Sequence, residues 1–166
     1  MANTHFATDG RLDVALGLTH TTAKHALGSR VQGNNNSEWM YVYASAAISQ
    51  YMTVGVEASG TASPLSVTEA RLGHTLGIAQ VGFAAADYGW VATKGNSLRV
   101  ATTAAVAVGV DLFTAASTPG RVDDAAVSTQ AQIGGLYLVA TASGTTASSA
   151  ACIAGNLVVI DAAFII

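Results

Sequence analysis

The sequence predicts an all-β protein, a compact β-sandwich or β-barrel with an extended N-terminal arm. Three observations lead to this prediction. Bulky apolar residues follow a two-residue period in short segments, and clusters of Gly, Asn, Ser and Thr separate these segments at steady intervals. The chain also lacks a sustained 3.6-residue apolar stripe, so its many alanines do not indicate helices. Many short strands separated by turns are typical of sandwiches and barrels.

Two parts are expected along the chain. Residues 1–25 form the predicted arm, because Thr, His, Asp and Gly interrupt any apolar period there. Residues 26–166 form the predicted β-sandwich or β-barrel domain. This domain opens with a hairpin between Ala26–Val31 and Glu38–Ala44, and Gly33–Ser37 forms its turn, since Asn and Gly tolerate a positive φ angle.

The second strand of this hairpin carries large side chains on both faces. Trp39, Tyr41 and Tyr43 share one face, because successive side chains of a strand point to opposite sides. Met40 and Val42 share the other face. We therefore expect a strand that is buried on two sides or covered by a neighbouring subunit.

Further strands follow at short intervals, with turn residues between them. The clearest hairpin is expected at Tyr88–Thr93 and Leu98–Thr102, because Lys94, Gly95 and Asn96 between them favour a chain reversal. The other predicted strands are Gln50–Ala58, Thr75–Phe83, Val106–Phe113, Gly135–Ala142 and Asn156–Ala162.

Composition indicates an assembling protein and disfavours two kinds of partner. Charged residues make up 10% of the 166 residues, against about 25% in soluble domains, so we expect neighbouring subunits to cover part of the surface. The net charge is -3 and the seven basic residues are scattered singly, so nucleic acid is not an expected partner. Asp111 and Asp161 interrupt the most apolar stretches, so no membrane partner is expected, and we predict a soluble protein made in a cytoplasm.

The residues that could carry chemistry do not form a recognisable motif. The spacing of His5, His20 and His25 matches no zinc pattern, and no predicted nucleophile accompanies His74. The glycines form no phosphate-binding or dinucleotide fingerprint. Cys152 lies in an alanine-rich segment and is expected to be a buried apolar residue. The sequence therefore predicts no catalytic residue, metal ligand or cofactor, and the protein is not expected to be an enzyme.

Five short segments, which together span roughly residues 26–162, carry a resemblance to a known group of proteins. They are Leu27–Gly33, Glu38–Val42, Leu76–Gln80, Tyr88–Gly95 and Val108–Phe113. In this order they resemble segments of the capsid decoration, or cement, proteins that stabilise the heads of tailed bacteriophages.

The resemblance implies a virion structural protein on the capsid exterior, synthesised in the host cytoplasm. It implies two partners, the major capsid protein and the chain itself as a homotrimer, and neither nucleic acid nor a membrane. The arm at residues 1–25 would then reach over a neighbour. The alternative function is a tail or fibre module that binds a host receptor or carbohydrate. A shell-forming capsid subunit is a third possibility, which the short chain disfavours.

The largest aromatic side chains are the candidate interface residues. Core packing is the simpler expectation for them, and burial across a subunit contact is the alternative, because Trp and Tyr combine a large area with a polar group. The candidates are Trp39, Tyr41, Tyr43, Tyr88 and Trp90.

Overall fold

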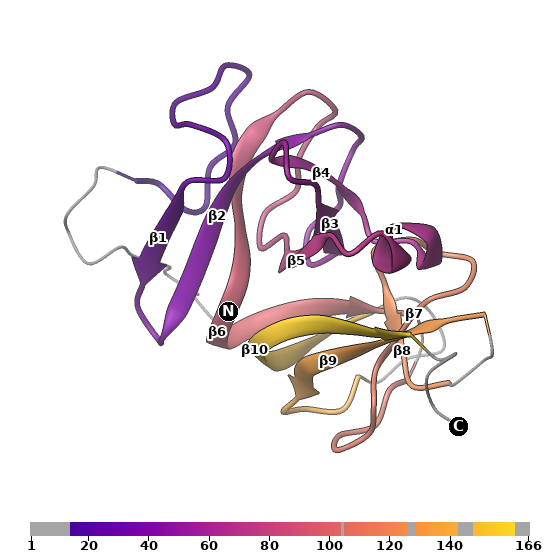
Figure 1. Cartoon of the computed structure of the whole chain (residues 1–166). Coiled ribbons are helices and arrows are strands. Elements are labelled where there is room, and N and C mark those ends of the chain that lie inside the picture. Colours follow the sequence, from indigo (N-terminus) through magenta and orange to yellow (C-terminus); the bar gives the residue numbers. More distant parts are fainter. Residues whose placement is uncertain (1–13, 104, 126–128, 143–147, 162–166) are drawn as a thin grey trace.

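The computed structural model describes residues 14–103, 105–125, 129–142 and 148–161, and it confirms the all-β prediction (Figure 1). Strands dominate the described residues, and the single helix found there is short. The elements are β1 (Arg30–Gly33), β2 (Ser37–Ala44), β3 (Thr53–Val56), β4 (Thr61–Pro64), α1 (Val67–Arg71), β5 (Thr75–Ile78), β6 (Tyr88–Thr102), β7 (Phe113–Thr114), β8 (Val122–Asp123), β9 (Ala131–Leu138) and β10 (Ser148–Asp161).

Five strands close into a barrel, in the order β2, β4, β3, β5 and β6, which pairs again with β2. The interior is filled by aliphatic side chains and one phenylalanine. Two glycines leave room for them: a Cβ on Gly89 would lie 2.7 Å from the ring of Phe83, and one on Gly77 would lie 2.9 Å from Val91. The barrel is therefore a packed core. Its buried interior residues are Met40, Val42, Ala44, Ile48, Val54, Val56, Ala62, Ala79, Phe83 and Val91.

The predicted first hairpin is confirmed. β1 pairs antiparallel with β2, and Asn35 and Asn36 in the turn both have a φ of 55°. Burial on two sides is confirmed for β2 as well. Met40 belongs to the barrel interior, whereas Trp39 and Tyr41 belong to a second core cluster on the outside of the barrel.

A second sheet packs against the barrel (Figure 1). It consists of β7, β8, β9, β10 and the second half of β6, and we call it the C-terminal sheet. β10 lies between β6 and β9 and is antiparallel to both. The short strands β7 and β8 connect β9 back to β6 through single pairs such as Thr102 with Val122. β6 thus belongs to both the barrel and the C-terminal sheet.

The hairpin predicted between Tyr88–Thr93 and Leu98–Thr102 is wrong, because both segments belong to the continuous strand β6. The first half of β6 pairs with β2 and the second half with β10. Gly95 lies between the halves, opposite an irregularity in β10, and β6 turns there from one sheet into the other (Figure 1). The residues with turn chemistry form a bend in a long strand, a common role of glycine at corners.

Other segments also differ from the predictions. β1 covers Arg30–Gly33 and not Ala26–Val31, and β10 begins at Ser148 and not at Asn156. Val106–Phe113 is not one strand: Val106 forms an isolated bridge with Ala142, and only Phe113 belongs to a strand, β7. Gly109, with a φ of 78°, forms a turn between them. The sequence pattern also missed β4, because this strand is short and only Ala62 in it is fully buried.

The predicted N-terminal arm lies partly outside the described residues, which begin at position 14. Residues 14–25 lie against the barrel. Leu16 is buried in the core, and His20 and Tyr88 form a backbone bridge with N to O distances of 2.8 and 2.7 Å. These contacts fix the segment beside the first residue of β6.

Candidate interaction surface

The five aromatic candidates form one cluster, and the barrel and its surroundings bury three of them. Trp39, Tyr41 and Trp90 are buried within the single chain, so they present no surface to a partner. Tyr43 and Tyr88 keep part of their rings exposed, and their ring centroids lie 5.1 Å apart. Trp39, Tyr41 and Trp90 therefore pack in the core.

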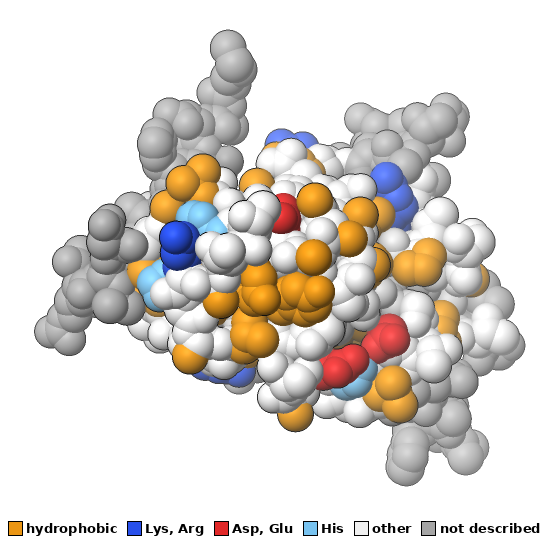
Figure 2. Space-filling model, turned by 90° about the horizontal axis from the view of Figure 1, so that it is seen from above, with side chains coloured by type: hydrophobic (Ala, Val, Ile, Leu, Met, Phe, Trp, Pro, Cys, Tyr) orange, Lys and Arg blue, Asp and Glu red, His pale blue; other side chains and the backbone are white. Residues whose placement is uncertain are grey.

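A loop before β1 explains this burial. The ring of His25 lies 5.1 Å from Tyr41 and 5.3 Å from Trp90, and the backbone N–H of Lys24 donates to the Tyr41 hydroxyl at 3.0 Å. The buried phenol therefore has a polar partner. In the view from above, a basic side chain lies directly beside histidine side chains on one side of the molecule (Figure 2).

A cavity of about 500 Å³ lies beside α1, β5 and β10. His74 lines it, and its Nδ1 is 3.0 Å from Oε2 of Glu69, a close contact that is poorly aligned for a hydrogen bond. Thr75 supplies the one hydroxyl among the residues that line this cavity. His74 and Glu69 connect β5 to α1, so the pair has a structural role in holding the helix.

Cys152 is buried in the C-terminal sheet, as the sequence predicts. Burial raises the pKa of its thiol to about 12, and the nearby Arg99 only partly opposes this shift. The thiol therefore stays protonated at neutral pH and is a poor nucleophile or metal ligand. Within the described residues no three His, Cys, Asp or Glu side chains gather as they would around a metal ion; His5 lies outside those residues.

The outward side of β9 and β10 carries several exposed apolar side chains. Residues 125–160 contain no Asp, Glu, Lys or Arg. Ile153 pairs directly with Tyr137, and the backbone N–H of Val139 donates to Ala151 at 3.0 Å. Side chains of paired residues share a face, so these residues lie together on the side away from the buried Cys152.

The exposed fractions show that the described part of the chain leaves this face open. Tyr137 is 60% exposed, Val139 52% and Ile153 37%. We call these three residues the outer face. Contiguous exposed apolar side chains on a sheet usually mark an interaction site, since burying them on association is favourable.

Sequence reasoning missed the outer face because its candidates are aromatic residues that alternate along a strand, whereas Tyr137 lies alone among aliphatic residues. The signal that could have found it is the long uncharged stretch combined with the alternation Leu136, Tyr137, Leu138, Val139. An uncharged strand with apolar residues at every position is covered on both faces in most proteins. Here the described part of the chain covers only one face of the strand, so the side chains on its other face are exposed.

Comparisons with known proteins leave the family open. No known protein family matches the chain, and no curated protein matches it either. In the part of the chain that the structure describes, no helix is long and apolar enough to cross a membrane.

Proposed function

We propose that this chain is a virion structural protein that decorates the outside of a phage capsid and joins adjacent major capsid protein subunits, as a homotrimer. The observation that carries the proposal is the outer face, where Tyr137, Val139 and Ile153 are exposed on an uncharged sheet. The resemblance of the five segments to decoration proteins indicates the kind of partner, a phage capsid. The activity is binding alone.

The outer face supplies the binding energy through burial of apolar area. A large apolar side chain that leaves water contributes about 1.5–3 kcal/mol, so three of them give one copy a modest affinity. A specific interface buries about 800 Å² on each partner, which is more than three side chains cover. Binding through several linked copies raises the overall affinity, and this favours a trimer on a repetitive shell.

The test is cosedimentation of the purified protein with emptied phage shells. Wild-type protein is expected to pellet with the shells and to raise their melting temperature. The double variant Tyr137→Asp/Ile153→Asp places two charges on the outer face and should lose most of this binding, while its own melting temperature changes little. Leu18→Asp is the matched control, because Leu18 is equally exposed but lies beside the barrel.

Three results would contradict the proposal or a part of it. Wild-type protein that neither binds shells nor changes their melting temperature excludes the decoration function. Binding of cells or glycans in its place supports the alternative, a receptor-binding or carbohydrate-binding module of a tail or fibre. Equal shell binding by the double variant and by wild type would show that the outer face is not the contact.

A further inference from the structure

A groove of about 340 Å³ borders the outer face at the edge formed by β6. Arg99 of β6 pairs with Ala151 of β10, so its side chain leaves the sheet on the same side as the outer face. Val139 belongs to both surfaces. We call this cavity the Arg99 groove; its lining residues are Tyr51, Asn96, Ser97, Leu98, Arg99, Val139, Ala151 and Cys152.

The Arg99 side chain is held in place by neutral groups of the described residues. Its guanidinium donates to the carbonyl and hydroxyl oxygens of Ser149, both at 3.0 Å. Its backbone N–H and carbonyl are both bonded by the side chain of Gln80, at 3.1 and 2.9 Å. Among the described residues no carboxylate lies within ion-pair distance of Arg99.

Tyr51 also lines the groove, and its backbone has an unfavourable conformation there. The Arg99 guanidinium lies 5.4 Å from the centre of its ring. Tyr51 has a φ of 71°, a region that large residues rarely adopt. Its backbone is fixed there by bonds to Ala79 at 2.6 Å and Ala101 at 2.7 Å. Strained residues of this kind gather at binding sites.

The chain carries a segment with the complementary chemistry. Between Val106 and Leu112 the backbone turns at Gly109, and the exposed side chains there are Val108, Val110 and Asp111. We call residues 107–111 the acidic knob. The Asp124 carboxylate accepts from the backbone N–H of Ala107 at 3.2 Å and so supports the base of the knob.

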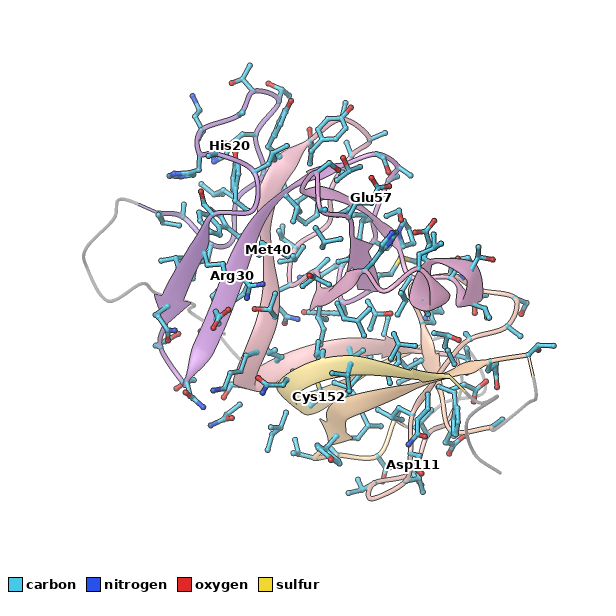
Figure 3. The ribbon with its side chains drawn as sticks, viewed as in Figure 1. His20, Arg30, Met40, Glu57, Asp111 and Cys152 are labelled. Carbon is cyan, nitrogen blue, oxygen red and sulfur yellow. The ribbon has the colours of Figure 1, made fainter. Side chains whose placement is uncertain are left out.

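The Asp111 carboxylate is available to a partner. No described residue forms a hydrogen bond or an ion pair with it. Asp111 lies at the end of the molecule opposite His20 and Glu57, beyond the strands of the C-terminal sheet (Figure 3). The knob therefore offers two exposed valines and one unpaired negative charge.

We propose that the acidic knob of one copy occupies the Arg99 groove of the next copy, and that Asp111 pairs there with Arg99. The valines of the knob then pack against Val139 and Ala151. The inference rests on the proposed homotrimer and names its contact. A knob and a groove are different surfaces, so the contact is head-to-tail, and the proposed homotrimer requires three such contacts to close into a ring.

Charge reversal tests this contact, with analytical ultracentrifugation of the full chain as the measurement. Asp111→Arg changes an exposed loop residue, so the variant should fold, and we expect its trimer to dissociate at least about 30-fold more readily than wild type. Arg99→Glu should weaken the trimer similarly. The double variant Asp111→Arg/Arg99→Glu restores opposite charges and should recover most of the association. Lys24→Glu is the control for an exposed charge reversal elsewhere.

The outcomes separate this inference from the proposed function. If wild type and both single variants are equally trimeric, or if the double variant is no better than either single one, the knob contact is excluded. If wild type is monomeric but binds shells, the knob contact is again excluded while the decoration function stands. If wild type forms trimers that the charge pair controls but binds no shells, the contact holds and the decoration function fails.

Discussion

The barrel and the C-terminal sheet use similar apolar residues in different ways. The barrel closes on itself, so one side of each strand fills a sealed interior, and its outer aromatic residues are covered by the rest of the chain. The β9–β10 pair covers only one face: Cys152 and Leu138 point into the core, while Tyr137 and Ile153 point outward. The cover that the rest of the chain gives to the outward side of a strand therefore decides which apolar residues stabilise the fold and which remain exposed.

The largest expected effect compares one aromatic residue from each region. Trp39 belongs to the buried cluster that packs against the outer side of the barrel. Trp39→Ala removes this fully buried side chain and should lower the free energy of unfolding by about 3–5 kcal/mol. Tyr137→Ala removes an exposed ring and should change it by less than about 0.5 kcal/mol. Urea unfolding of the two variants measures the difference. Equal losses would mean that Tyr137 supports the fold and is not reserved for a partner.

A smaller effect tests the packed interior of the barrel. Gly89→Ala places a Cβ 2.7 Å from the Phe83 ring, so the ring or a strand must move, and we expect a loss of about 1–3 kcal/mol. Gly17→Ala is the matched control, because no atom lies within 4 Å of its added Cβ. Thermal unfolding of both variants distinguishes them. A barrel with a loose interior would tolerate Gly89→Ala as well as the control.

The smallest effect concerns pH and the C-terminal sheet. The pKa of Cys152 is raised from an ordinary 9.0 to about 12 in the folded chain, so its stabilising contribution is complete below pH 9 and is lost as the pH rises toward 12. Between pH 8 and pH 10 the free energy of unfolding should fall by about 1 kcal/mol more in wild type than in Cys152→Ala. Urea unfolding under reducing conditions measures this. Identical losses in the two proteins would show that the thiol ionises as easily in the folded state as in the unfolded one.

The sequence was sufficient where local chemistry decides the structure. The turn at Asn35 and Asn36 and the two bulky faces of β2 followed from residue type and a two-residue period. The course of β6 did not, because the bend at Gly95 depends on two partners far away in the sequence, β2 and β10. A turn that contains glycine and a bend that contains glycine have the same local sequence pattern, so the sequence alone does not distinguish them.

The candidate surface was harder to predict than the fold. Their size makes Trp39 and Trp90 interface candidates, but residues such as Leu16, far away in the sequence, belong to the same buried cluster and leave them almost no exposed area. Tyr137 and Ile153 are smaller and appear ordinary in the sequence. Their importance depends on which face of the sheet the chain leaves uncovered, and this is a property of the three-dimensional packing.

Hydroxyl-radical footprinting of the free and shell-bound protein tests the central claim most directly. Tyr137 reports on the C-terminal sheet, and the half-exposed Tyr43 and Tyr88 report on the barrel within the same sample. We predict that shell binding removes most of the reactivity of Tyr137 and leaves that of Tyr43 and Tyr88 unchanged. Protection of Tyr43 and Tyr88 with undiminished reactivity at Tyr137 would contradict the account and would place the contact on the barrel.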